Sequence, residues 1–267
     1  MADWNPELYN RFRRYREEPV LMMLDRLAPR AEDRIIDLGC GSGENTIELA
    51  KRSAGGFALG TDSSPAMIDR AEALRAKLEL PLRDRVAFRL EDINDFHADR
   101  DYTVVFSNAT LHWVPDHRAV FRSIFAALKP GGRVAIQMPA NYDETAQVEL
   151  LRLASEEPWR DALKSVDVPS HSVMEPEQYR KMLPELGFIS VECFYYIFKH
   201  PMDDPGEVVA WMLPTTMRPF MDALAEDRHR EFIDALGERL CEAYGTRAKL
   251  IFPFRRLFVF CSRPPMA

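Results

Sequence analysis

A cluster of glycines beside acidic side chains is the feature of the sequence most clearly able to do chemistry. The residues run Asp37-Leu-Gly-Cys-Gly-Ser-Gly43, and Glu44 follows directly. Glycine permits left-handed backbone angles and close approach of another molecule, because it has no Cβ. Ile35 and Ile36 are typical of a buried strand, and a helix that begins after the cluster would point its free N–H groups into the same space. The stretch predicts a strand, turn and helix that bind a ligand at the turn; a turn without a ligand is the plain alternative.

The spacing of the glycines separates two classes of cofactor. Dinucleotide-binding turns have the pattern G-x-G-x-x-G, whereas here the glycines are Gly39, Gly41 and Gly43, and Glu44 takes the place of the third dinucleotide glycine. A pyrophosphate beside that carboxylate would be repelled. The string instead resembles the first motif of class I S-adenosylmethionine (SAM) methyltransferases. SAM has no phosphate and carries an ammonium and a sulfonium, so Asp37 and Glu44 are compatible with it.

Acidic residues recur where later strands are expected to end. Residues 56–62 read as a second strand, and Asp62 at its end lies 19 positions after Gly43. An acid at this place accepts the ribose hydroxyls of an adenosine in both classes of nucleotide-binding fold. Asp62 could instead cap a helix, although Ser64 followed by Pro65 is the better N-cap.

The third and fourth strands supply further candidates. Residues 86–90 read as a strand followed by Asp92 and Ile93, which could accept the adenine amino group and pack on the adenine ring; capping of a loop is the alternative for Asp92. Residues 102–108 read as a stronger strand. The loop from Asn108 to Trp113 is then expected beneath the reacting centre.

Helical periodicity alternates with these strands. Apolar residues on one face are expected for a helix before the first strand, a helix from Pro65 and a helix from Asp116: Leu21, Leu24, Leu27; Met67, Ala71, Leu74, Leu78; Val120, Ile124, Leu128. Residues 133–139 read as a fifth strand, and residues 188–198 and 255–261 as two long late strands. Five strand and helix alternations predict an α/β fold with a parallel, Rossmann-like sheet and helices on both faces. The two late strands follow without a classical crossover, which favours a seven-stranded sheet with an antiparallel last strand, as in class I methyltransferases. The long segments around these strands are expected to form a helical lid.

Length and composition favour one domain over residues 1–267, because no linker or composition break divides the chain. Within it we expect an N-terminal helical cap (1–30), a SAM-binding core (31–140) and lid insertions (141–185 and 203–250). The sequence begins without the features of a signal peptide and has no apolar run of about 18 residues, so we expect a cytoplasmic protein.

Charge and metal-ligand patterns limit the partners. The formal net charge is −7, from 35 basic and 42 acidic residues, which argues against nucleic acid or an anionic membrane and favours a small molecule. The four cysteines form no C-x-x-C pair and the six histidines no H-E-x-x-H motif, so neither a disulfide framework nor a metal site is indicated.

Taken together, the sequence is similar to the trans-aconitate methyltransferases, small bacterial SAM-dependent carboxyl O-methyltransferases. The resemblance extends over nearly the whole chain and is carried by these segments: Asp3-Trp-Asn-Pro-Glu-Leu-Tyr9, residues 37–43, Asp62-Ser-Ser-Pro-Ala-Met67, Asn108-Ala-Thr-Leu-His-Trp-Val-Pro-Asp116, Gln137-Met-Pro-Ala-Asn141 and Met217-Arg-Pro-Phe220. The glycine motif specifies only the superfamily; the Asp-Trp-Asn-Pro, Gln-Met-Pro and Arg-Pro segments are more specific.

The resemblance implies methylation of a carboxylate of a small organic acid, with SAM as methyl donor, S-adenosylhomocysteine as product, and a monomer or weak homodimer. No side chain is expected to be essential for catalysis, with His112 and Trp113 positioning the reactants. Residues expected to bind the cofactor are Asp37, Gly39, Cys40, Gly41, Gly43, Asp62, Ser63, Met67, Asp92, Ile93 and Asn108. Residues expected to bind the substrate are Tyr9, His112, Trp113, Gln137 and Arg218.

Other features leave alternatives open. The Leu-His-Trp loop and parts of the lid also look like the juvenile hormone and farnesoic acid carboxyl methyltransferases, which keeps a more lipophilic acid possible. The lid is rich in aromatic and Met side chains that could line a pocket or only fill a core: Phe194, Tyr195, Tyr196, Phe198, Trp211, Met212 and Met217. Methylation of a nitrogen or phenol, and a SAM-binding protein without turnover, are the remaining rivals.

Overall fold

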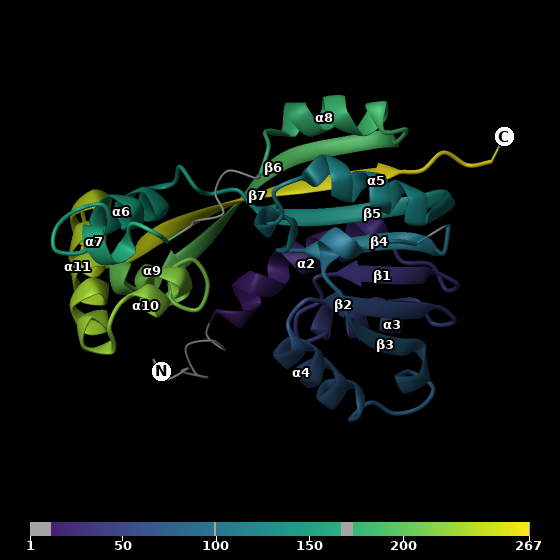
Figure 1. Ribbon diagram of the computed structural model, residues 1–267, viewed down its shortest axis with the longest axis horizontal. Helices are drawn as coiled ribbons and strands as arrows, with labels where there is room; N and C mark the ends of the chain where they lie inside the picture. The colour runs from purple at the N-terminus through teal and green to yellow at the C-terminus, as the bar shows by residue number, and fades with distance from the viewer. Residues whose placement is uncertain (1–11, 99, 167–172, 267) are drawn as a thin grey trace. The chain divides into compact units, whose positions relative to one another are not determined.

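The computed structural model, which describes residues 12–98, 100–166 and 173–266, contains a seven-stranded sheet (Figure 1). The strand order is β3-β2-β1-β4-β5-β7-β6. The strands are β1 (Arg34–Leu38), β2 (Phe57–Asp62), β3 (Val86–Leu90), β4 (Tyr102–Asn108), β5 (Leu128–Pro139), β6 (Ile189–Met202) and β7 (Leu250–Ser262).

The first five strands are parallel and place β1 at the middle of the parallel part. Ile35 pairs with Ala58 of β2 and with Val104 of β4, and the side chains of all three are fully buried. A parallel strand with a neighbour on each side and helices on its faces buries almost every residue, which explains the continuous apolar run. The carboxyl ends of β1, β2 and β4 therefore lie beside one another at one edge of the sheet.

Strand β7 reverses the direction. The end of β7 lies beside the start of β5, where Gly131 N donates to Arg263 O at 3.1 Å. An earlier residue of β7, Arg255, lies beside the end of β5, where its carbonyl oxygen accepts from Ala140 N at 3.0 Å. The two strands therefore run antiparallel. The hydroxyl of Ser262 in turn donates to Ile189 O at the start of β6. The predicted fold, a mostly parallel sheet with an antiparallel last strand, is confirmed.

The chain divides into two compact units. Unit 2 contains residues 18–139, 171–196 and 257–267 and holds the parallel strands; unit 1 contains residues 1–17, 140–170 and 197–256. Helices with residues in unit 2 are α2 (Arg13–Leu27, which begins in unit 1), α3 (Glu44–Arg52), α4 (Pro65–Arg75), α5 (His117–Ala127) and α8 (Pro176–Glu185). Helices of unit 1 are α6 (Thr145–Ala154), α7 (Arg160–Leu163), α9 (Pro205–Met212), α10 (Arg218–Ala223) and α11 (Glu226–Tyr244). The prediction of one domain with lid insertions stays a prediction.

Each unit has its own apolar core. In unit 2, α3 packs on β1 and β2 and α4 packs on β2 and β3. In unit 1, aromatic and Met side chains of the helices and of the residues that precede them pack with the end of β6 and the start of β7. They include Phe12, Trp159, Trp211, Met212, Met217, Phe220, Phe232 and Phe252. Of the aromatic and Met residues that we noted in the lid, Trp211, Met212 and Met217 belong to this core, and Phe198 is also buried.

Several element boundaries and one helix face differ from expectation; β6 and β7, for example, extend beyond the predicted residues 188–198 and 255–261. Strand β5 begins at Leu128 instead of Arg133, because Leu128 pairs with Tyr102 of β4 and therefore does not extend the preceding helix. Helix α4 ends at Arg75, so Leu78 lies in the turn beyond it. Leu21 is 46% exposed although Leu24 and Leu27 are buried. Spacings of three residues fall short of a helical turn, so a run of them drifts around the helix.

Candidate active site

The glycine turn between β1 and α3 is tied to the end of β2. The N–H groups of Gly39 and Cys40 both donate to Thr61 O at 2.8 Å, and Gly41 N donates to Asp62 Oδ2 at 2.9 Å. The φ angles of Gly39, Gly41 and Gly43 are +73°, +55° and +89°. These values lie in the left-handed region that side chains with a Cβ disfavour. The backbone of this turn therefore favours glycine at all three places.

The space around the three glycines differs. A Cβ on Gly39 would lie 2.2 Å from the Thr110 side chain, and a Cβ on Gly43 would lie 2.5 Å from the Phe88 ring. A Cβ on Gly41 would meet no atom within 4 Å. Gly39 and Gly43 thus serve packing inside the protein. Gly41 faces open space, which is where a ligand cradled by the turn would lie.

Asp62 organises this turn with both of its oxygens. Besides the bond from Gly41, Oδ1 accepts from Ser64 N at 2.9 Å, at the residue that precedes α4. Ser64 is the N-cap residue, but its own side chain makes no capping bond. Asp62 is half-buried, Ser63 is exposed and Met67 is half-buried. The carboxylate therefore has a structural role, and its remaining acceptor capacity stays available for a ligand.

Asp37, at the end of β1, is a buried acid below the turn. Its carboxyl group is 1% exposed and accepts a hydrogen bond from Thr46 Oγ1 of α3 at 2.7 Å. Burial raises the pKa of Asp37 to about 7; the Thr46 bond opposes the rise, and the negative charge of Asp62 adds to it. Because two acids share one small region, a cation bound beside them would be favoured electrostatically.

The acid after β3 caps a short 3-10 turn. Asp92 Oδ1 accepts from both Asn94 N and Asn94 Nδ2 at 2.8 Å, and the turn that it caps is η2 (Ile93–Asp95). The carboxyl group is exposed and Ile93 is half-buried. The structure therefore shows the loop-capping role that we considered, and the adenine contacts of Asp92 and Ile93 stay predictions.

The loop after β4 joins three strand ends. Ala109, at φ +54°, donates its N–H to Gln137 O of β5 at 2.9 Å, and Thr110 Oγ1 donates to Gly39 O at 3.1 Å. Asn108 Oδ1 is buried without a hydrogen-bond partner among the described residues. A buried amide oxygen in this state is expected to gain a donor from a ligand or a water. Asn108 and Gln137 are thus brought to the same strand ends as the glycine turn.

His112 and Trp113 lie in η3 (Leu111–Trp113) within this loop. His112 is buried, Trp113 is 56% exposed, and their ring centroids are 5.0 Å apart. An indole exposed at the edge where the strands end offers a large apolar face and one N–H donor to a bound molecule. His112, which packs beneath it, is better placed to hold the indole than to reach solvent.

His117 fixes the same loop, and sequence reasoning missed it. The Nε2 atom of His117 lies 2.8 Å from the carbonyl oxygen of Leu111. Because a carbonyl oxygen can only accept, Nε2 carries the proton and donates. The other nitrogen, Nδ1, then accepts from the hydroxyl of Tyr179 in α8 at 2.5 Å. Burial lowers the pKa of His117 despite the Leu111 bond. A neutral imidazole therefore joins η3 to α8. The partners are 62 residues apart, and the spacing of residues in the sequence gives no signal of such a pair.

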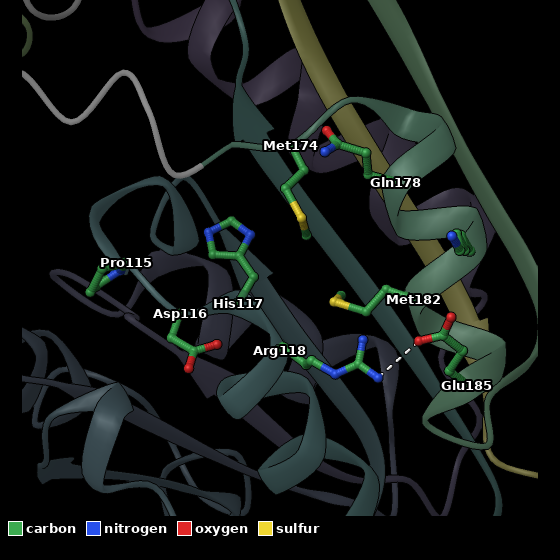
Figure 2. A pocket seen from close by; sticks show the side chains of 9 residues that line it. Pro115, Asp116, His117, Arg118, Met174, Gln178, Met182 and Glu185 are labelled. Carbon is green, nitrogen blue, oxygen red and sulfur yellow. Dashed lines mark hydrogen bonds and ion pairs between the residues drawn. The ribbon is translucent and has the colours of Figure 1, made fainter.

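A surface groove of about 600 Å³ lies between α5 and α8 (Figure 2). Its lining residues are Pro115, Asp116, His117, Arg118, Met174, Gln178, Lys181, Met182 and Glu185. An ion pair between Arg118 and Glu185 at 2.9 Å closes one side. None of the residues that we predicted to bind cofactor or substrate lines this groove.

Two of the predicted substrate residues remain to be placed, Tyr9 and Arg218. Tyr9 falls outside the described residues. Arg218 is the first residue of α10 in unit 1, where its side chain is 71% exposed and its Nε lies 3.8 Å from Asp222 Oδ2. Its substrate role stays a prediction.

Thiol and metal chemistry receive no positive support from the described residues. Burial raises the pKa of the Cys40 thiol above its usual value, with the charges of Asp37 and Asp62 adding to the rise. Within the described ranges no group of His, Cys, Asp or Glu residues is arranged to hold a metal ion. No described helix is long and apolar enough to cross a membrane.

Comparison with known proteins agrees with this geometry. A family model described as a methyltransferase domain matches residues 29–187. The trans-aconitate 2-methyltransferase of Methylobacterium radiotolerans is 34% identical over 263 residues, covering 97% of this chain and 98% of that protein.

Solved structures share the fold at low sequence identity. The YcgJ protein of Bacillus subtilis has a TM-score of 0.61 at 14% identity, covering 94% of this chain and 100% of that one. Phosphoethanolamine N-methyltransferase 2 of Haemonchus contortus, in complex with S-adenosyl-L-methionine, has a TM-score of 0.57 at 19% identity, covering 92% of this chain and 52% of that one.

The sheet order, the glycine turn and these matches define an S-adenosylmethionine-dependent methyltransferase of the class I fold. Within that class the chain belongs to the trans-aconitate 2-methyltransferase family, whose members match it from end to end.

Proposed function

We propose that the protein transfers a methyl group from SAM to a carboxylate oxygen of a small organic acid, with trans-aconitate as the first candidate. The observation that carries the proposal is the end-to-end identity of 34% with a trans-aconitate 2-methyltransferase. The open space at Gly41 beside two acids supports it, because that site suits a ligand that is cationic and has no phosphate.

The residues at the strand ends fit this cofactor. Asp37 balances the positive charge of the methionine part, while the remaining acceptor capacity of Asp62 receives the ribose hydroxyls. The open face at Gly41 leaves room for the chain between them. The neighbouring residues complete the proposed cradle. Asp92 and Ile93 contact the adenine, the backbone of Gly39 and Gly43 shapes the turn, and Cys40, Ser63, Met67 and Asn108 surround the rest of the cofactor. SAM supplies an electrophilic methyl group when it is bound.

The acid substrate asks little of the protein. A carboxylic acid with a pKa near 4 is ionised at neutral pH, so no general base is needed. The chain must align a carboxylate oxygen with the methyl group of SAM and must exclude water from the site. The Asn108, His112, Trp113 and Gln137 side chains, from the ends of β4 and β5, are the groups of unit 2 that we assign to this positioning.

Product chemistry tests the reaction. The protein is incubated with methyl-labelled SAM and a panel of mono-, di- and tricarboxylic acids, and the label is followed before and after mild base. A labelled product that loses its label in base is the methyl ester that we expect. A base-stable product would instead indicate methylation of nitrogen or a phenol, and SAM binding without any product would indicate a protein without turnover.

A calorimetric titration with SAM and with NAD tests the cofactor independently. Micromolar binding of NAD without binding of SAM would contradict the proposal.

One argument for a more lipophilic acid was that aromatic and Met side chains of the lid could line a pocket. Trp211, Met212 and Met217 instead fill the core of unit 1, so these three residues do not support such a substrate.

A further inference from the structure

The carbonyl group of Leu111 is where the η3 turn is held from outside. Its oxygen accepts from Val114 N at 2.9 Å and from Nε2 of His117, the first residue of α5, at 2.8 Å. A peptide unit is planar, so two bonds to this oxygen fix the orientation of the peptide group that joins Leu111 to His112. The direction in which the turn continues to Trp113 is fixed with it.

His117 is held in turn by Tyr179 of α8, whose hydroxyl donates to Nδ1 at 2.5 Å. Tyr179 is 0% exposed and His117 is 3% exposed. The Tyr179 ring packs on Phe121 with ring centroids 6.1 Å apart, and Phe121 packs at the same distance on Phe188. Apolar side chains could fill such a core, because replacing both partners of a buried hydrogen bond is often nearly neutral. A satisfied buried polar pair adds a fixed arrangement.

His117 also lines the groove between α5 and α8 (Figure 2). Both of its ring nitrogens are engaged, Nε2 by Leu111 and Nδ1 by Tyr179. A neutral imidazole has one donor and one acceptor, so its hydrogen-bonding capacity is used by these two partners. The geometry therefore favours a role in holding the turn over contact with a molecule in the groove.

Trp113 is the side chain that this arrangement directs. Its indole is 56% exposed, so burial does not fix its place, whereas Leu111 and Val114 on either side of it are buried. An exposed ring on a rigid turn is preorganised to meet a bound molecule. The whole series of contacts, from Tyr179 through His117 to Trp113, lies within unit 2.

We propose that His117 and Tyr179 are positioning residues for methyl transfer, which hold the η3 turn so that the Trp113 indole aligns the acid. This inference rests on the proposed function for the reaction and for the role of Trp113. Both residues act through the Leu111 carbonyl group, and neither is assigned a contact with a reactant. A displacement of about 1 Å in a group that aligns a substrate can lower the rate on the order of a hundredfold.

Two variants weaken the pair to different degrees. Tyr179→Phe removes only the hydroxyl, and His117→Leu removes both ring nitrogens. We expect kcat/KM for the best acid substrate to fall at least tenfold in each, with SAM affinity within twofold. His117→Gln restores an N–H donor for Leu111 O and should recover at least fivefold in kcat/KM over His117→Leu.

Tyr102→Phe is the matched control. It removes a hydroxyl from another buried tyrosine of unit 2, at the start of β4, whereas η3 follows the end of that strand. This variant should leave kcat/KM within twofold of the wild type.

A double-mutant cycle tests whether the pair acts through the indole. With Trp113→Phe already present, the further change Tyr179→Phe should alter kcat/KM less than twofold, because there is no indole left to displace. A pair that only stabilises the fold would lower the melting temperature and leave kcat/KM of the folded protein unchanged.

Fluorine NMR of the whole protein labelled with 5-fluorotryptophan follows the indole without turnover. The chain has four tryptophans, and Trp113→Phe identifies the Trp113 signal. We expect this signal to shift or broaden in Tyr179→Phe and His117→Leu and to stay in place in Tyr102→Phe. The signals of the two tryptophans of unit 1 helices and caps, Trp159 and Trp211, should stay in place in every variant.

An unchanged Trp113 signal in folded Tyr179→Phe would overturn the proposal, whether or not His117→Leu folds. A shifted signal with unchanged kcat/KM would overturn the role in methyl transfer, as would an equal loss of kcat/KM in Tyr102→Phe. If the signal shifts as expected but the wild type methylates no carboxylic acid, the proposed function fails and the hold of His117 and Tyr179 on the η3 turn remains.

Discussion

At the scale of single residues, Asp37 makes the stability of the ligand-free protein depend on pH. The pKa of its carboxyl group is about 7 in the folded protein and near 3.8 when the chain is unfolded. Between these values the folded protein keeps a proton that the unfolded chain has lost, so the free energy of unfolding falls as pH rises. The contribution is fully present below about pH 4 and is lost as the pH rises through about 7.

Asp37→Asn removes this titration and should flatten the profile. We expect the free energy of unfolding of the wild type to fall relative to the variant by up to ~1.4 kcal/mol per pH unit between about pH 5 and 7. Urea denaturation of both proteins without ligand, at pH 5, 6, 7 and 8, measures the difference. Parallel profiles would show that Asp37 is not a strongly perturbed acid.

Gly41→Ala, compared with a control glycine, tests whether the open space at Gly41 holds the cofactor. The added Cβ meets no protein atom, but we expect it to enter the space that the cofactor occupies and to weaken SAM binding at least tenfold, about 1.4 kcal/mol. Gly131→Ala is the matched control, because Gly131 has φ +75° and is likewise open. Both variants bear the left-handed strain of about 1 kcal/mol. Equal SAM affinities in the two variants would remove Gly41 from the cofactor site.

Some site residues could be predicted from sequence and others could not. Asp37 and Asp62 follow apolar strand segments, and parallel strands end at the same edge of a sheet, so their neighbourhood follows from pattern alone. Thr46 bonds to Asp37, and Thr110 bonds to Gly39, only because separate elements of the chain pack together. No local pattern marks such pairs. The bond between Tyr179 and His117 depends in the same way on α8 lying beside α5.

At the scale of elements, the strands were predicted more accurately than the helix faces. Strands β3 and β4 have the predicted bounds, because short apolar runs between turn residues fix both ends. Helix α4 buries only Ala71 fully, although Met67 and Leu74 fall on the same predicted face. Burial of a helix face depends on how far its neighbours extend, which the sequence of the helix itself does not contain.

One glycine substitution, Gly43→Ala, tests the packing of α3 and α4 against β3. Gly43→Ala places a Cβ 2.5 Å from the Phe88 ring and 3.0 Å from Ala71 Cβ, at φ +89°. We expect this overpacking and strain to lower the free energy of unfolding by about 2 to 4 kcal/mol.

Gly237→Ala, in the middle of α11 with no atom within 4 Å, should raise the free energy of unfolding by about 0.5 to 1 kcal/mol. Thermal or urea unfolding of the two variants, each against the wild type, gives the two signs. A neutral Gly43→Ala would mean that the Phe88 ring moves aside freely.

At the scale of the whole molecule, an excess of seven negative charges opposes the approach of an anionic acid. The protein must overcome that field locally with a small number of cationic groups. Arg218, in the Arg-Pro segment of the family resemblance, is our candidate on α10, and it is exposed with one distant acidic neighbour, Asp222. An exposed pair of this kind contributes little to stability, so its arginine can be changed without unfolding the protein.

Arg218→Lys keeps the charge and removes the planar fork that binds a carboxylate through two bonds. We expect KM for a multiply charged acid to rise at least tenfold, about 1.4 kcal/mol, with SAM affinity within twofold. Arg230→Lys is the matched control, since Arg230 also belongs to unit 1, is highly exposed and pairs with an aspartate four residues later, Asp234. Initial rates over a range of acid concentrations at saturating SAM measure both variants. If the two variants share one KM with the wild type, Arg218 has no part in holding the acid.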